Sequence, residues 1–192
     1  MEYNIFRAPI DNDRIIKEQW YAAGYDKSVI RVYDTFVKKE DEGISIRSSA
    51  VISAPHVQKI IEFQVSWKVS LSGKINMKLE ATRNVEMPYL PRFGLRLFLD
   101  ERMDQVEYFG YGPYENYSDK HQSSYLGLFR TDAETMHENY IRPQENGSRC
   151  GCRYVRYLDP VYTGVSSLKK IFLSVSQNIH KKSCVQKDII LN

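Results

Sequence analysis

The sequence lacks the features that mark secreted, membrane or disulfide-linked proteins. Three cysteines among 192 residues are an odd number, which argues against a disulfide framework. No apolar run approaches the ~20 residues of a membrane-spanning helix, and the N-terminus lacks the charged-then-apolar pattern of a signal peptide. These absences predict a cytoplasmic protein with no membrane partner.

An excess of charge of one sign is also missing. The chain carries 27 Lys and Arg against 24 Asp and Glu, a net charge of +3, and its basic residues are spread over the whole length. Proteins that bind nucleic acid usually gather such residues into a stripe or patch. No nucleic-acid partner is therefore expected.

Familiar catalytic motifs are absent as well. The chain has no P-loop and no G-x-S-x-G nucleophile elbow. In "GYGPYE" two glycines have the spacing of a dinucleotide-binding loop, but Glu115 stands where the third belongs and no βαβ pattern surrounds it. Four scattered histidines suggest no triad. No catalytic residue is therefore predicted.

Two segments resemble metal sites, but neither has the ligands or the spacing that a metal ion requires. Residues 11–13, "DND", match the start of a calcium loop, but Ile16 and Ala22 occupy its sixth and twelfth positions. Their side chains are expected to cap turns instead. Cys150 and Cys152 are too close together for a zinc knuckle, so two small buried thiols are expected. No metal ligand is predicted.

What the chain does have is a series of strand patterns rich in β-branched and aromatic residues. The expected strands lie in residues 28–39, 43–54, 60–71, 75–79, 92–100, 150–158, 168–177 and 187–192. A hairpin around Ser72 and Gly73 alternates apolar and polar residues, which indicates one wet face. One short helix is expected at 15–24, ending at Gly24. The pattern predicts an all-β protein of large antiparallel sheets with minor helix, in one domain spanning 1–192.

The stretch "YFGYGPYENYSDKHQSSYLG", residues 108–127, is the least ordinary part of the chain. It holds five tyrosines and three glycines in twenty positions, which predicts a loop rather than a strand. Because long loops in compact domains often carry function, the segment from Tyr108 to Arg149 is the expected functional region.

Aromatic and hydrogen-bonding side chains are concentrated there. The set comprises Tyr111, Tyr114, Glu115, Asn116, Tyr117, Asp119, Gln144, Glu145, Asn146 and Arg149. Aromatic rings can stack on the C–H faces of sugars while amides and carboxylates bind hydroxyl groups. The same residues can also form a buried polar network that only holds the loop together. Composition leaves both alternatives open.

Three segments carry a family resemblance. "FRAPIDNDR" (6–14), "GYGPYENYSDKHQSSYLG" (110–127) and "YIRPQENGSRCGCRYVRY" (140–157) resemble, in order, segments of the C-terminal sandwich domain of family-two β-galactosidases, the small chain. The resemblance implies a galactose-mutarotase-like supersandwich. It also implies a parent enzyme that hydrolyses terminal β-galactosides with retention of configuration, using two glutamates of a separate (β/α)₈ barrel.

The resemblance also suggests the role of this chain. In the family, the catalytic glutamates and the metal ions belong to the barrel. This chain is therefore expected to have no cofactor of its own and to be an accessory domain that supports the active-site rim. Its expected partners are the remaining domains, the galactoside substrate and further copies in a homo-oligomer. The candidate carbohydrate-facing residues are Arg7, Asp13, Tyr111, Glu115, Asn116 and Asn146.

Other functions remain open beside this one. The fold can equally serve an autonomous carbohydrate-binding module, an epimerase-like enzyme or a purely structural domain, because one scaffold hosts many functions. Lys120 departs from the arginine that some family members carry, which changes the geometry of the donor.

The end of the chain is expected to lack strands. The resemblance weakens from Leu158 onward, and in the family further strands would follow Asn192. A sheet edge with Ile189, Ile190 and Leu191 exposed is therefore expected, which predicts either self-association or a poorly ordered final segment.

Overall fold

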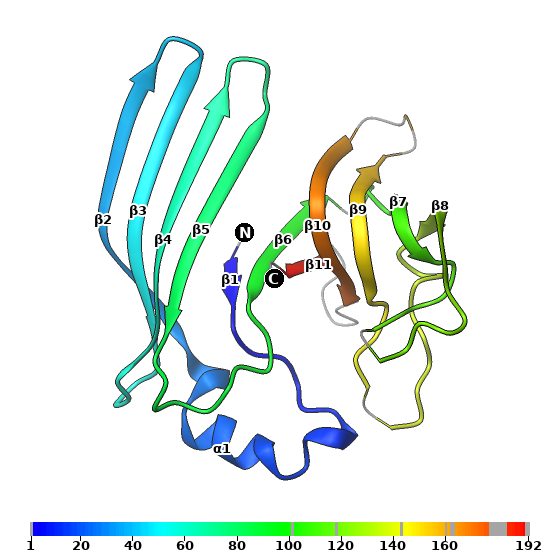
Figure 1. Ribbon diagram of the computed structural model, residues 1–192, viewed down its shortest axis with the longest axis horizontal. Coiled ribbons are helices and arrows are strands. Elements are labelled where there is room, and N and C mark those ends of the chain that lie inside the picture. Colours follow the sequence, from blue (N-terminus) through cyan, green and yellow to red (C-terminus); the bar gives the residue numbers. More distant parts are fainter. Residues whose placement is uncertain are drawn as a thin grey trace. The chain divides into compact units, whose positions relative to one another are not determined.

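The computed structural model describes residues 2–100, 102–117, 119–142, 144–159, 161, 164–176 and 184–190, the last two ranges by their backbone alone (Figure 1). The chain divides into two compact units: unit 1 comprises residues 1–14 and 91–192, and unit 2 comprises residues 15–90. That residues 1–192 form a single domain stays a prediction.

Unit 2 consists of a short helical segment followed by a four-stranded antiparallel meander. Its strands, in the spatial order β2-β3-β4-β5, are β2 (Val29–Glu40), β3 (Gly43–Ser53), β4 (Lys59–Ser70) and β5 (Ile75–Arg83). Helix α1 (Ile16–Ala22) precedes them, and a 3₁₀ turn (Tyr25–Lys27) links it to β2. Gly24 follows the helix with a left-handed φ of 69°, which confirms the predicted helix end.

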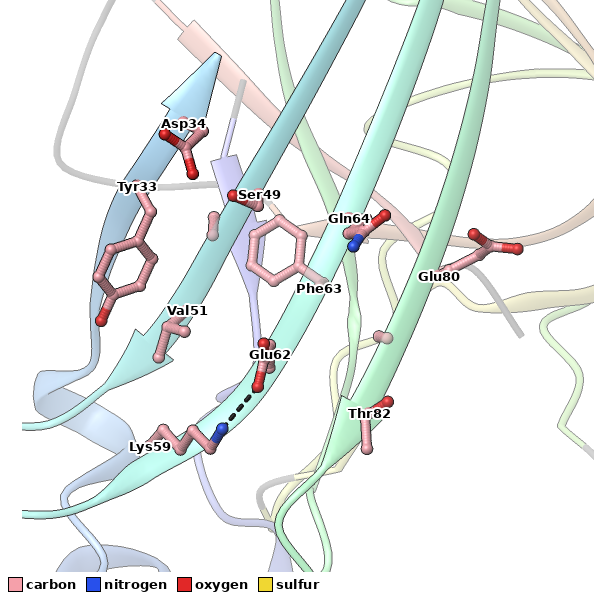
Figure 2. A pocket seen from close by; sticks show the side chains of 12 residues that line it. Tyr33, Asp34, Ser49, Val51, Lys59, Glu62, Phe63, Gln64, Glu80 and Thr82 are labelled. Atoms are coloured by element: carbon pink, nitrogen blue, oxygen red, sulfur yellow. Dashed lines mark hydrogen bonds and ion pairs between the residues drawn. The ribbon is translucent and has the colours of Figure 1, made fainter. Parts of the chain in front are cut away.

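The strand register gives the sheet of unit 2 two chemically different faces. Trp67 pairs with Met77 and Val65 with Leu79, so apolar side chains oppose each other on one face of the β4–β5 hairpin. Ser66 pairs with Lys78 on the other face, which confirms the predicted wet face. An open depression lies over all four strands, lined chiefly by residues of the polar face and also by Ala50, Phe63 and Ala81 (Figure 2).

Unit 1 contains a seven-stranded antiparallel sheet in the spatial order β1-β6-β11-β10-β9-β7-β8. Its strands are β1 (Glu2–Asn4), β6 (Gly94–Asp100), β7 (Gln105–Gly112), β8 (Tyr125–Asp132), β9 (Arg149–Leu158), β10 (Gly164–Ser176) and β11 (Cys184–Ile190), with a 3₁₀ turn at Asp11–Asp13. The all-β, antiparallel class is confirmed. The supersandwich arrangement stays a prediction.

The prediction of one continuous loop from Tyr108 was wrong in part. Residues up to Gly112 belong to β7, and β8 begins at Tyr125, so the two strands form a hairpin within the predicted loop. The glycines of β7 allow close packing: a Cβ at Gly110 would lie 2.8 Å from the sulfur of Cys152, and one at Gly112 would lie 2.4 Å from the Tyr108 hydroxyl oxygen. Glycines inside a strand often mark such close approaches.

The prediction that the last segment forms a sheet edge was also wrong. Strand β11 lies inside the sheet: Ile189 pairs with Leu173 of β10 on one side and with Leu95 of β6 on the other. The expected exposure of the side chains of 189–191 lies outside the described residues. The edge strands are β1 and β8 in unit 1 and β2 and β5 in unit 2. Self-association therefore stays a prediction, but an unpaired edge at the final strand can no longer be its cause.

Candidate functional site

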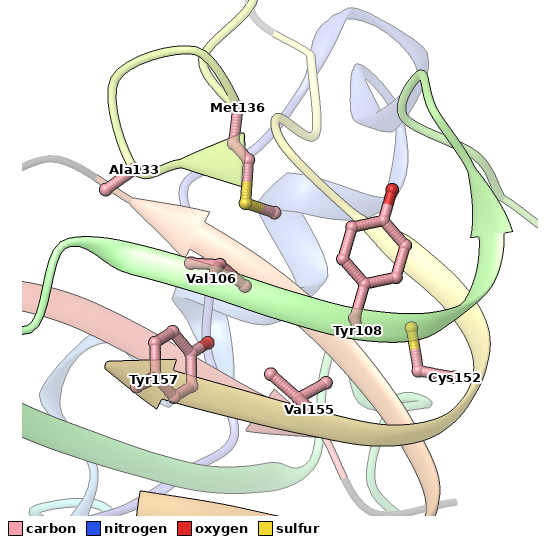
Figure 3. Close-up of a cluster of buried hydrophobic side chains, with 7 residues drawn as sticks. All are labelled: Val106, Tyr108, Ala133, Met136, Cys152, Val155 and Tyr157. Carbon is pink, nitrogen blue, oxygen red and sulfur yellow. The ribbon is translucent and has the colours of Figure 1, made fainter. Parts of the chain in front are cut away.

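A buried apolar cluster of unit 1 supports the functional region. Its members come from β7, β9 and the segment after β8 (Figure 3). They are Val106, Tyr108, Ala133, Met136, Cys152, Val155 and Tyr157. Phe129 packs against this cluster with its ring centroid 5.4 Å from that of Tyr108. The segment after β8 is thus anchored to the hydrophobic core of unit 1.

Glu115 is a buried carboxylate that other protein groups hold. Its side chain accepts hydrogen bonds from Lys120 Nζ at 2.9 Å, from the backbone N–H of Gly147 at 3.1 Å, and from the Tyr140 hydroxyl. The residue is 2% exposed. Because a lysine cation and two further donors satisfy it, the carboxylate ties the segment 115–120 to residues 140 and 147.

Asn116 connects the same segment to β9. Its Nδ2 donates to the carbonyl oxygen of Tyr111 at 2.7 Å, and its Oδ1 accepts from the backbone N–H of Cys150 at 2.8 Å. Its own N–H donates to the carbonyl of Ser148 at 2.9 Å. With 0% of the residue exposed, both ends of the amide are committed to the protein.

Arg149 is buried at the start of β9 and joins three groups. Its Nε donates to the Tyr108 hydroxyl at 3.1 Å, and its terminal nitrogens donate to the carbonyls of Ser148 and Pro113 at 3.1 and 3.2 Å. Burial raises the pKa of Tyr108, although the nearby Arg149 cation opposes that shift. The tyrosine is therefore a neutral hydroxyl between core and loop.

A second charged cluster joins the N-terminal segment to the segment after Tyr140. Arg7 contacts Asp13 at 2.5 Å and Glu145 at 2.9 Å, and Arg92 forms a further ion pair with Glu145. Asp13 also accepts the backbone N–H of Ile10 at 2.8 Å, which confirms that it caps a turn. Glu145 thus bridges two arginines from distant parts of the sequence.

The structure brings most of the predicted site residues into these two networks. Glu115 and Asn116 belong to the first, and Arg7 and Asp13 to the second. Asn146 instead binds the backbone of Glu138 through both ends of its amide. Each of these five residues has partners within the protein. That they face carbohydrate stays a prediction.

Tyr111 differs from the other five candidates because it is exposed. Its ring lies 5.5 Å from that of His121, centroid to centroid. Other tyrosines of the region are exposed as well, namely Tyr114, Tyr125 and Tyr140. The region therefore combines a buried ionic interior with an aromatic surface, which suits contact with a sugar or with another protein surface.

Sequence reasoning missed two members of these networks. Arg92 lies in "YLPRFG", outside the three family-like segments, and no local pattern connects it with Glu145. Tyr140 stands at the edge of the third segment, but nothing in its neighbourhood marks it as a partner of Glu115. Both contacts span more than 20 residues, so no pattern within a strand or a turn could have indicated them.

The two neighbouring cysteines are poorly suited to thiolate chemistry. Burial raises the pKa of Cys150 to about 11 and that of Cys152 to about 12. The Cys150 thiol donates to the carbonyl of Asn116 at 3.3 Å. Cys152 is buried, which confirms one of the two buried thiols expected, while Cys150 is only half-buried.

We expect Cys150 to react slowly with iodoacetamide in the folded chain. A pKa raised from 9.0 to about 11 leaves about a hundredfold less thiolate at neutral pH than an ordinary thiol has. The rate, followed by mass spectrometry in a Cys184→Ser background, should rise as the pH approaches 11 and should jump on unfolding in urea. Alkylation of the folded protein at the rate of a free thiol would contradict the burial of this residue.

Among the described residues, no three side chains of His, Cys, Asp or Glu gather as potential ligands of a metal ion. No helix in the described part of the chain is long and apolar enough to cross a membrane.

The chain is similar in sequence to a known protein family and to several named proteins. The family model of the β-galactosidase small chain matches residues 1–185. The chain is 40% identical over 156 residues to a β-galactosidase of Actinobacillus pleuropneumoniae and 36% identical over 156 residues to one of Staphylococcus xylosus. A β-galactosidase of Vibrio cholerae is 32% identical over 167 residues. These matches cover 80–81% of this chain but only 16% of each relative.

Proposed function

The chain belongs to the β-galactosidase small chain family, and from this membership we propose that it is one part of a retaining β-galactosidase. In that enzyme it serves as an accessory domain beside the barrel that carries out hydrolysis. The proposal depends on one observation: the family match spans residues 1–185, whereas the chain corresponds to only 16% of relatives that are named β-galactosidases.

The state of the ion-paired carboxylates supports an accessory role. A retaining glycosidase needs two carboxyl groups about 5–5.5 Å apart, one of which is free to attack the sugar. Glu115 is bonded to Lys120, and Glu145 lies between two arginines. Both carboxylates are thus engaged by cations of the chain itself, and neither is free to attack a sugar. These glutamates hold the loops, and catalysis is left to the barrel.

The two networks suggest how the domain supports the enzyme. They hold the connections around β8 against the core of unit 1, and the exposed tyrosines Tyr111, Tyr114, Tyr125 and Tyr140 form the surface offered to the other domains or to the galactoside. Tyrosine suits such a surface because it adds a large contact area and a hydroxyl at a small entropic cost. Tyr111 is the candidate for direct contact with sugar.

The remaining features of the parent enzyme follow from the same proposal. Its partners for this chain are its own remaining domains and a galactoside, and it forms a homo-oligomer in the cytoplasm. Any metal ions belong to the barrel. These features rest on the family resemblance.

The proposal predicts that the isolated chain does not hydrolyse β-galactosides. With a chromogenic galactoside it should give only the rate of the buffer. A chimera in which this chain replaces the matching segment of the Actinobacillus pleuropneumoniae enzyme should stay active, with kcat/KM within about tenfold of the parent, or about 1.4 kcal/mol of transition-state stabilisation.

Two outcomes would contradict this proposal. One is turnover by the isolated chain that Glu115→Gln abolishes, because it would place catalysis in this domain. The other is a chimera that folds and assembles like the relative yet shows no activity, because an accessory domain of the same family should support the same barrel.

A further inference from the structure

The depression on the polar face of the β2–β5 sheet has the size of a ligand site. Its volume is about 710 Å³, within the range of about 300–1,000 Å³ found for small-molecule pockets. All of its lining residues belong to unit 2. Neither the family resemblance nor the networks of unit 1 assigns it a function.

The register of the sheet aligns polar side chains across the depression. Two cross-strand rows lie on this face, because residues two apart on a strand point the same way. The first row is Asp34, Ser49, Gln64 and Glu80, and the second is Val51, Glu62 and Thr82. Figure 2 shows these side chains together with Tyr33 and Lys59. The depression therefore offers carboxylates, an amide and hydroxyls spread across the four strands.

A bulge in β2 brings an aromatic ring to the same place. The register of β2 and β3 shifts between Val32 and Asp34, which leaves Tyr33 as the extra residue, and both Tyr33 and Asp34 line the depression. A bulge of this kind interrupts regular alternation, and it leaves Tyr33 bordering the depression next to Asp34. Tyr33 remains 58% exposed, with the Arg31 guanidinium carbon 5.3 Å from its ring centroid.

The charges at the depression are largely neutralised by neighbouring lysines. Lys59 contacts Glu62 at 2.5 Å, and Lys78 contacts Glu80 at 2.7 Å. Within the part of the chain that the structure describes, Asp34 is the lining carboxylate without such a pair. Because one acceptor charge remains among neutral groups, the site suits an uncharged polar ligand better than a polycation or an anion.

We propose that this depression binds a neutral saccharide. The exposed ring of Tyr33 provides a surface for the C–H face of a pyranose, while Asp34 and Gln64 accept and donate hydrogen bonds to its hydroxyls. Ser49 adds a hydroxyl between them, and Thr82 adds one in the neighbouring row. Binding here requires no hydrolysis and no barrel, so it stands apart from the proposed function of the chain.

Titration of the ¹⁵N-labelled 192-residue chain with lactose tests the proposal by NMR. Amide signals of Tyr33, Asp34, Ser49 and Gln64 should shift together, with a Kd in the millimolar range, roughly that of an open and solvated site. Tyr33→Ala should weaken binding by about tenfold, since stacking contacts are typically of that size. Tyr33→Phe should retain it, because the ring remains.

Matched controls separate this site from other surfaces. Tyr114→Ala removes an exposed tyrosine of unit 1 and should leave the lactose shifts in unit 2 unchanged. Gln64→Ala should weaken binding without removing an aromatic ring, which covers the case in which Tyr33→Ala perturbs the fold.

Several results would overturn the proposal. These are the absence of shifts around Tyr33 at lactose concentrations about tenfold above a millimolar Kd, shifts confined to Tyr111 and its neighbours, or tighter binding of spermidine than of lactose at the same residues. None of these results bears on the galactoside activity of the chimera, so the two proposals fail independently.

Discussion

Replacing Asn116 with aspartate is expected to lower the free energy of unfolding by about 3–5 kcal/mol near neutral pH, the cost of an uncompensated buried charge. The two side chains have the same shape, so no cavity forms. The Nδ2 donor that binds the Tyr111 carbonyl becomes a carboxylate oxygen, which faces that carbonyl without a proton between them. With no solvent contact at this position, the charge cannot be hydrated.

The same variant should recover stability in acid. Burial beside a carbonyl raises the pKa of the new carboxyl group above its value in the unfolded chain, which is about 3.9. A raised pKa in the folded state means that the lost stability returns as the pH falls through that pKa and disappears again as the pH rises. Urea unfolding across this range, each point compared with the parent chain, measures the effect.

An exposed asparagine of the same chain provides the control. Asn76 lies exposed on β5, and Asn76→Asp should change the stability by no more than about 0.5 kcal/mol. If Asn116→Asp behaved like this control, Asn116 could not be the buried connector that the structure describes.

Truncating Trp20 to alanine is expected to destabilise the chain by about 3–5 kcal/mol, the usual cost for a large buried aromatic. Trp20 is 1% exposed, its Nε1 donates to the carbonyl of Tyr89 at 3.0 Å, and its ring meets that of Tyr89 edge to face. The truncation removes this packing and leaves the carbonyl without that donor. Thermal or urea unfolding measures the loss.

Tyr21 is the matched control for Trp20. It follows Trp20 in helix α1 but is 47% exposed, so Tyr21→Ala should cost much less, within about 1 kcal/mol. Equal effects of the two truncations would mean that α1 is not anchored through Trp20.

The Asn116 and Trp20 variants together also test the predicted single domain, because the residues lie in different units. A chain that folds as one domain has one unfolding transition, which both substitutions should shift. Two units that fold separately would give two transitions, each sensitive to one substitution only.

Much of the secondary structure could be read from local patterns. The alternation in residues 60–71 and 75–79, with Gly73 between them, predicted the β4–β5 hairpin and its polar face. Gly24 marked the end of α1. These signals are local because the period of a strand and the left-handed turn at a glycine depend on a few neighbouring residues.

The sequence pointed to the polar residues of unit 1 but not to their contacts, and that they face a sugar stays a prediction. The three family-like segments pointed to Arg7, Asp13, Glu115, Asn116 and Asn146, and the structure gives each of them a polar partner. That Glu145 joins Arg7 to Arg92 could not be inferred, because these arginines lie 138 and 53 residues from it along the chain. Pairing at such separations is decided by the packing of the whole sheet.

The amino-acid sequence by itself determined the all-β class, the positions of most strands and the family, because these depend on periodicity and on motifs that survive without knowledge of neighbours. The tertiary structure decided the rest. It made "FGYG" a strand, since Gly110 and Gly112 allow contact with Cys152 and Tyr108. It also placed β11 inside a sheet between β6 and β10, because a strand's position is set by partners far away in the chain.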